Sequence, residues 1–398
     1  MIILFVTYWS LSDGLTQGAA MPHLRQLAAL EQVRRIVLVT LERKGVPAPT
    51  IGLTAQLPDK VVHQPIYPRD YKLNLLSKIF DFMVLPGQLK KLVQYEKADH
   101  IVAVGTLAGA LVHLTAIPLK IPYLVSFYEP HAAYMQENKV WKTYDPRYVF
   151  QKKWEKEQAL AAQGLLVVSD AFKRELMRRY TLPAEKVVVL RNAVDEAMFY
   201  YSKEVRRVFS NATVGIYVGK YGGLYYAHEA FQIYRRCFEV IPNFRLIILS
   251  PQPQEEILQY LVACAIDVEK VHVASVTHAE VPAYLSAADF AFATIKSYPS
   301  ARYCSPVKIG EYWANGLPVL LTEGVGDDSD IIHREGGGAT FNLKEEGSLD
   351  RALLKILQII QDPAHRQQIP ELARKYRSSE RIREAYAYFF GQSGEELP

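Results

Sequence analysis

Two charged residues in the last quarter of the chain, Lys308 and Glu311, have the types and spacing of a nucleotide-binding site. They stand three positions apart, so on a helix they share one face near its start. A lysine beside a helix N-terminus attracts phosphate, and a carboxylate one turn further on can accept two ribose hydroxyls. An ordinary ion pair on a surface helix has the same spacing, so spacing alone leaves both possibilities open.

The residues around this pair predict a helix followed by a strand. Ser305 is suited to cap the helix, and Pro306 fits its first position. Gly316 is suited to end the helix in a left-handed turn. The apolar run Leu317–Leu321 then predicts a strand of a parallel sheet.

A second segment with phosphate-binding character begins near residue 214. The run Val214–Val218 predicts a strand, and three glycines follow it: Gly219, Gly222 and Gly223. Glycines let backbone N–H groups approach a phosphate closely because no β-carbon intervenes. Lys220 is placed to neutralise a leaving diphosphate. The pattern is not G-x-x-x-x-G-K-[ST], so a P-loop is excluded.

The start of the chain repeats this arrangement. A strand expected at Ile2–Val6 is followed by Gly14 and Gly18 and then by a helical pattern, so we expect a glycine loop that lines a ligand cleft. The loop lacks G-x-G-x-x-G, and no acidic residue closes the strand expected at Ile36–Thr40. These absences disfavour a nicotinamide cofactor.

Polar residues also follow the strand expected at Tyr123–Ser126. His131 can hydrogen-bond a sugar hydroxyl there, and Glu129 can act on the proton of an acceptor. A histidine in a loop is as often structural or solvated, so this role stays open. The other histidines, such as His272 and His278, show no metal-ligand spacing, and we expect no metal site.

Short apolar runs alternate with amphipathic stretches along the whole chain, which predicts an α/β protein with parallel sheets. The charged, irregular stretch 199–212 divides it. We therefore expect two Rossmann-like domains that face each other across a cleft, residues 1–203 and 210–378. The aromatic stretch 379–398 is expected to form a helix that returns to the first domain.

Composition sets the class of protein and its compartment. The chain has 398 residues, of which 49% are hydrophobic and 22% charged, as in a soluble globular protein. Its three cysteines form no disulfide framework, and no leader precedes the first strand, so we expect a cytoplasmic protein. The uncharged run His100–Leu119 has the length of a membrane span, but its glycines favour a strand, a turn and a buried helix.

Two features raise the question of a membrane surface. Residues 1–205 carry 26 Lys and Arg against 19 Asp and Glu, although the net charge of the chain is only +4. The segment Tyr71–Lys97 mixes apolar residues with lysines, which is typical of a helix lying on a membrane. A core-facing helix with lysines that reach solvent has the same pattern, and it is the interpretation we favour.

Taken in order, these segments resemble the retaining GT-B glycosyltransferases of family four, which use nucleotide sugars and build bacterial surface glycans. The resemblance covers nearly the whole chain. The segments that carry it are Leu165–Phe172, Val187–Asp195, Gly219–Gly223, Tyr284–Asp289, Ser305–Val319 and Gly324–Gly326.

The resemblance implies a role for each group of residues. Lys220 and the backbone of the three glycines would hold the diphosphate, with Lys308 near the phosphates or the sugar and Ser305 at the helix start. Glu311 would take the ribose hydroxyls. His131 would contact the sugar, and the Gly14–Gly18 loop would touch donor or acceptor.

The family also implies the substrates. The donor would be a UDP- or GDP-sugar and the acceptor a saccharide or a lipid-linked glycan. Peripheral contact with the inner face of the cell membrane stays open, since it depends on how the segment Tyr71–Lys97 lies. No cofactor and no nucleic acid are expected. Tyr303 stands where the family commonly has a second glutamate that contacts the donor sugar. It leaves open a non-catalytic scaffold on the same fold, and a sugar-nucleotide epimerase is a further alternative.

Overall fold

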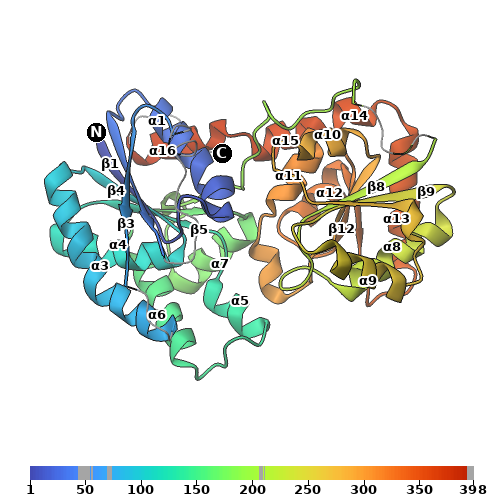
Figure 1. The fold of residues 1–398 in the computed structure, drawn as a ribbon. Coiled ribbons are helices and arrows are strands. Elements are labelled where there is room, and N and C mark those ends of the chain that lie inside the picture. The colour runs from blue at the N-terminus through green and yellow to red at the C-terminus, as the bar shows by residue number, and fades with distance from the viewer. Residues whose placement is uncertain (44–53, 55–56, 70–73, 206–208, 210, 392–398) are drawn as a thin grey trace. The chain divides into compact units, whose positions relative to one another are not determined.

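The computed structural model describes the chain apart from residues 44–53, 55–56, 70–73, 206–208, 210 and 392–398. It divides into two compact units. The first comprises Met1–Ala193 with the C-terminal segment from Ser379, and the second comprises Val194–Ser378. Each unit contains a parallel β-sheet with helices packed around it (Figure 1).

The first unit contains a seven-stranded sheet in the order β3-β2-β1-β4-β5-β6-β7. Its strands are β1 (Ile2–Thr7), β2 (Arg35–Leu41), β3 (Val61–Ile66), β4 (His100–Val104), β5 (Tyr123–Phe127), β6 (Gly164–Val167) and β7 (Val187–Val189). Its helices are α1 (Met21–Ala29), α3 (Asn74–Glu96), α4 (Thr106–Leu119), α5 (His131–Glu137), α6 (Pro146–Ala161), α7 (Asp170–Tyr180) and α16 (Glu380–Phe389).

The second unit contains a six-stranded sheet in the order β10-β9-β8-β11-β12-β13. Its strands are β8 (Thr213–Val218), β9 (Phe244–Leu249), β10 (Val271–Ala274), β11 (Phe290–Ala293), β12 (Val319–Thr322) and β13 (Gly338–Phe341). Its helices are α8 (His228–Val240), α9 (Gln254–Ala263), α10 (Val281–Ser286), α11 (Val307–Ala314), α12 (Asp328–Glu335), α13 (Ser348–Gln361), α14 (His365–Gln368) and α15 (Pro370–Arg377).

The expectation of an α/β protein with two parallel sheets is confirmed, and the uncharged run His100–Leu119 is indeed a strand, a turn at Gly105 and a buried helix. Short apolar runs in the sequence do not predict β3 or β13, and both strands lie at sheet edges. Edge strands need less apolar surface, and β3 even contains Pro65, which edge positions tolerate. Among the described helices, none combines the length and apolar character that crossing a bilayer requires.

The division between the units falls earlier than the expected one at 203–210. The backbone N–H of Val194 donates to the carbonyl of Arg377 (2.9 Å), and Phe199 is buried in the core of the second unit. At the other end of the chain, α16 packs beside α1, where the His23 ring and the Tyr386 hydroxyl hydrogen-bond (2.8 Å; Figure 1). The segment from 379 onward therefore belongs to the first unit.

Candidate functional site

Helix α11 and the turn after it carry the two charged residues from which the sequence analysis began. Gly316 has φ +72°, and its N–H donates to the carbonyl of Trp313 (2.8 Å). The N–H of Leu317 donates to the carbonyl of Tyr312 (2.9 Å). Together these bonds form a Schellman motif, so the expected helix end at Gly316 is confirmed.

The expected start of this helix is wrong by one residue. Pro306 occupies the N-cap position, and no side chain caps the helix. The Ser305 hydroxyl instead accepts a hydrogen bond from the guanidinium of Arg377, which is fully buried and pairs with Asp328 (2.6 Å). A buried guanidinium needs oxygen partners for its N–H groups, and this demand occupies the oxygen that would have capped the helix.

Lys308 is buried, and its ammonium is enclosed by aromatic rings. The Nζ atom lies 4.0 Å from the ring centre of Tyr225 and 4.7 Å from that of Tyr217. A β-carbon on Gly219 would lie 2.9 Å from Nζ, so the ammonium sits directly against the glycine turn. Within the described part of the chain Nζ has no hydrogen-bond partner. Burial lowers the pKa of Lys308 to about 7, and the nearby Glu311 charge opposes that shift.

The glycine turn follows β8 and is tied to α11. Gly219, Gly222 and Gly223 have φ of +138°, +86° and +60°, a range that favours glycine. A β-carbon on Gly222 or Gly223 would meet nothing within 4 Å, so the turn borders open space. The N–H of Val218 donates to the Tyr312 hydroxyl of α11 (3.1 Å). The exposed Lys220 follows Gly219 on this turn.

Glu311 has a partner that sequence reasoning missed. Its Oε1 atom accepts a hydrogen bond from Nε2 of His278 (2.9 Å), a residue on the loop before α10. The Glu311 side chain is 10% exposed and that of His278 is 63% exposed. The hydrogen bond to Glu311 raises the pKa of His278, and burial acts against it. No sequence signal joins the two, because 33 residues separate them and only the folded chain brings them together.

These contacts exclude the simpler explanation of the Lys308–Glu311 spacing. Both residues are buried on α11, Lys308 faces tyrosine rings and Glu311 faces His278. An ordinary ion pair on a surface helix is therefore wrong. The second unit instead groups a buried cation, a nearly buried carboxylate and a glycine turn around one helix, α11.

Tyr303 belongs to the short 3₁₀ turn Pro299–Tyr303 that leads into α11. Its side chain is half-buried, and the guanidinium of Arg302 lies 5.0 Å from the centre of its ring. Tyr303 is thus close in sequence to Lys308, and its ring faces a cation.

Glu129 and His131 follow β5 in the first unit and contact each other. Oε1 of Glu129 and Nδ1 of His131 lie 2.8 Å apart, and both side chains are partly exposed. His131 begins α5, and its ring packs edge-on against Trp141 (5.6 Å between centres). The carboxylate holds one ring nitrogen, which leaves Nε2 as the nitrogen that can meet a ligand.

Gly14 and Gly18 do not form the expected glycine loop. The carbonyl of Asp13 accepts from the N–H of Gln17 (3.0 Å), and its carboxylate accepts from the N–H of Leu15 (2.8 Å). A helical turn therefore begins just after Asp13 and continues through a π-helical turn into α1. A β-carbon on either residue would meet nothing within 4 Å, so neither position requires a glycine.

Within the residues that the structure describes, no three His, Cys, Asp or Glu side chains form a group that could hold a metal ion.

Two protein-family models match the chain. Glycosyltransferase Family 4 matches residues 24–197, and Glycosyl transferases group 1 matches residues 211–359. No curated protein sequence matches the chain.

Solved structures of similar fold span the full chain. Sucrose-phosphate synthase from Thermosynechococcus elongatus has a TM-score of 0.72 at 16% identity, over 99% of this chain and 100% of that chain. HepE from Anabaena in complex with UDP-glucose has 0.69 at 14%, again over 99% and 100%. The lipopolysaccharide outer core galactosyltransferase WaaB has 0.65 at 13%, over 99% and 100%. At these identities the likeness establishes the fold.

The fold and the family matches together define a GT-B glycosyltransferase that uses nucleotide-sugar donors. The chain belongs to glycosyltransferase family four.

The hydrogen bond between Glu311 and His278 can be tested in solution. We expect Glu311→Gln to lower the pKa of His278, because the amide keeps the shape of the side chain but removes the charge that favours the imidazolium. The measurement is an NMR pH titration of the His278 ring. Glu280→Gln is the control, since Glu280 lies on the same loop and bonds to Thr277. An unchanged pKa in Glu311→Gln contradicts the pairing.

Proposed function

We propose that the protein transfers a sugar, with retention, from a UDP- or GDP-sugar to a saccharide or lipid-linked acceptor in the synthesis of a bacterial surface polysaccharide. The proposal rests mainly on the buried ammonium of Lys308, near the start of α11. It lies against the glycine turn that follows β8 and has no hydrogen-bond partner in the described chain. HepE was solved with UDP and with UDP-glucose, which favours a UDP-sugar. WaaB is a lipopolysaccharide outer core galactosyltransferase, which favours a surface glycan.

In this proposal the diphosphate binds at the glycine turn. The backbone N–H groups of Gly222 and Gly223 and the N-terminus of α11 are donors for its oxygens. A diphosphate beside Lys308 favours the charged ammonium, since an opposite charge raises a pKa that burial has lowered. Glu311 accepts the ribose hydroxyls, with His278 holding one of its carboxylate oxygens in place.

The chemical step needs little more than positioning and charge. The acceptor hydroxyl oxygen bonds to the anomeric carbon on the face from which the diphosphate leaves, and the bond from that carbon to the diphosphate oxygen breaks. The acceptor proton passes to the departing diphosphate, and no enzyme carboxylate forms a bond to the sugar. Lys308, Lys220 and the helix N-terminus stabilise the charge that grows on the diphosphate, so we propose transfer without a metal ion. On the acceptor side, the bond from Glu129 orients His131, whose Nε2 is placed to contact a sugar hydroxyl.

A second candidate rests on Tyr303. A phenol ring replaces the acid that contacts the donor sugar in related enzymes, which is compatible with a protein that binds nucleotide sugars without turning them over. The epimerase alternative is disfavoured, because both family models that match the chain are glycosyltransferase models.

A panel of UDP-, GDP- and dTDP-sugars separates the two candidates. Each donor is incubated with the protein, with and without a mixture of saccharide acceptors, and released nucleotide is measured. Release that depends on the acceptor supports transfer, and the anomeric configuration of the product by NMR tests retention. Tight binding of a nucleotide sugar without turnover on any donor supports the scaffold and overturns the enzyme proposal.

Lys220 is expected to act on the rate of reaction more than on binding. The Lys220 side chain is exposed next to Gly219, where charge on the departing diphosphate increases in the transition state. We expect Lys220→Ala to lower kcat by about 100-fold, a typical loss for one electrostatic donor, with a smaller change in donor Kd. Lys270→Ala is the control, since Lys270 is part-exposed and pairs with Asp267 (3.6 Å). Equal losses in kcat and in donor affinity contradict this role.

We also propose that the first unit makes peripheral contact with an anionic membrane through an apolar surface on α3, α4 and α6. A hollow of about 460 Å³ lies there, and its rim includes the exposed side chains of Ile79, Met83 and Phe150. Exposed cations flank these side chains: Lys78, Arg147, Lys152 and Lys153. Apolar groups that enter the headgroup region and cations that meet anionic lipids are the two components of interfacial binding.

Vesicle sedimentation tests this contact. We expect the protein to bind vesicles that contain phosphatidylglycerol more strongly than vesicles of phosphatidylcholine alone, and Met83→Asp to weaken binding about ten-fold, because a charge replaces an inserting apolar group. Val262→Asp is the control, since Val262 is similarly exposed (69% against 74% for Met83) but lies on α9 of the second unit. Equal binding of Met83→Asp and the unchanged protein contradicts the proposed surface.

A further inference from the structure

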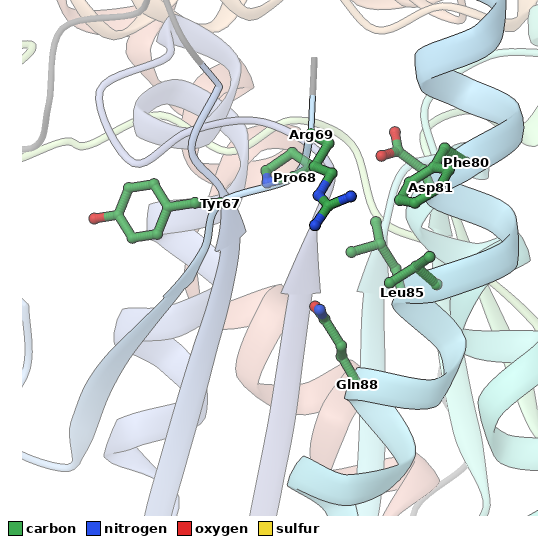
Figure 2. Close-up of a pocket in the computed structure, with 8 residues that line it drawn as sticks. Tyr67, Pro68, Arg69, Phe80, Asp81, Leu85 and Gln88 are labelled. Carbon is green, nitrogen blue, oxygen red and sulfur yellow. The ribbon is translucent and has the colours of Figure 1, made fainter. Parts of the chain in front are cut away.

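We propose that a pocket between the end of β3 and helix α3 binds one sugar ring of the acceptor, with the carboxylate of Asp81 accepting its hydroxyls. The pocket has a volume of about 300 Å³, at the lower end of the range for small-molecule sites. Figure 2 shows Tyr67, Pro68 and Arg69 on one side of it, and Phe80, Asp81, Leu85 and Gln88 of α3 on the other. This inference rests on the proposed transferase function.

The pocket lies where parallel sheets bind ligands. Tyr67–Arg69 directly follow β3, Tyr8 directly follows β1, and Arg43 follows β2 by two residues. These three strands are neighbours in the sheet, so their following residues meet at one carboxyl edge. Helix α3 contributes positions 80, 81, 84, 85 and 88, whose spacing places them on a single helical face.

Asp81 is buried, and among the described residues only one of its two carboxylate oxygens has hydrogen-bond partners. Its Oδ2 atom accepts from the Tyr8 hydroxyl and forms an ion pair with Arg43, which also donates to the Tyr8 oxygen (2.9 Å). Its Oδ1 atom has no hydrogen-bond partner among the described residues, although Asp81 is 1% exposed and lines the pocket. A buried oxygen without a donor is unfavourable by about 1–3 kcal/mol, which a ligand hydroxyl removes.

The Tyr8 and Arg43 contacts fix the carboxylate in this orientation. Burial and the hydrogen bond to Asp81 raise the pKa of Tyr8, so its proton remains on the phenol and is donated to Oδ2. The two donors together occupy one oxygen and leave the other for a ligand.

The remaining lining residues suit a carbohydrate. Arg69 and Gln88 are exposed donors at the mouth, and the guanidinium of Arg69 lies 6.0 Å from the ring centre of Phe80. Figure 2 shows the exposed ring of Tyr67 directed away from α3, so the aromatic ring of the lining that can meet the C–H face of a sugar is that of Phe80. A few polar side chains beside an aromatic ring are typical of a site for a single sugar ring. The volume of the pocket is small for a whole nucleotide sugar.

Methyl glycosides test the pocket without a donor. The methyl α-glycosides of glucose, galactose, mannose and N-acetylglucosamine serve as probes in saturation-transfer NMR. We expect at least one to bind, and the exposed-residue variants Gln88→Ala and Arg69→Ala to weaken that binding about ten-fold. Gln94→Ala is the matched control, since Gln94 is an exposed glutamine on α3 that does not line the pocket. Asp81→Asn should abolish binding where circular dichroism shows that it folds.

Two results overturn the inference. One is that no probe binds. The other is that Gln88→Ala and Arg69→Ala bind the probes as well as Gln94→Ala does. Once a donor is known, the same two variants should raise the acceptor KM while donor KM and donor hydrolysis in water stay constant. An active enzyme whose acceptor KM is unchanged in both variants refutes the pocket alone, whereas absent turnover on every donor refutes the proposed transferase.

Discussion

A buried ammonium that forms no hydrogen bond with any described residue is the constraint on which the second unit depends. Taking Lys308 out of water disfavours its charged form, and the two tyrosine rings offset only part of this, since a cation–π contact contributes about 0.5–2 kcal/mol. In the proposed function the diphosphate of the donor supplies the remaining stabilisation. The surrounding chain is built to allow it, because Gly219 has no β-carbon at the point where Nζ lies and the turn beyond it borders open space.

Glu311, one helical turn from Lys308, is held in place by a hydrogen bond. His278 holds one oxygen of Glu311, and the raised pKa of His278 links this contact to pH. Because the folded-state pKa is above the ordinary value near 6.5, the pair contributes its full stability below that value and loses it as pH rises through the folded pKa. A nearly buried carboxylate fixed on one side is suited to accept hydroxyls on the other, and it stands one helical turn from the cation.

Local chemistry made parts of this arrangement predictable. The left-handed glycine that ends α11, the glycines after β8 and the alternation of strands and helices each follow from a few adjacent residues. Tertiary contacts decided the rest. Ser305 does not cap α11 because Arg377, 72 residues later, takes its hydroxyl, and Glu311 meets a histidine that no spacing connects to it. Gly14 and Gly18 lie in helical turns because Asp13 starts the helix early.

Helix α3 shows why a single amphipathic pattern supported two interpretations. Leu85, Leu89 and Val93 are buried, as a core-facing helix requires, while Ile79 and Met83 are exposed beside cations, as a membrane surface requires. Asp81 is on the same helix and faces the polar pocket with Gln88. Core, apolar surface and polar pocket thus share one helix of 23 residues. A lipid-linked sugar has matching parts, an apolar anchor and a hydroxylated ring. The proposed acceptor, if lipid-linked, therefore accounts for both surfaces of α3, which a freely soluble saccharide would not require.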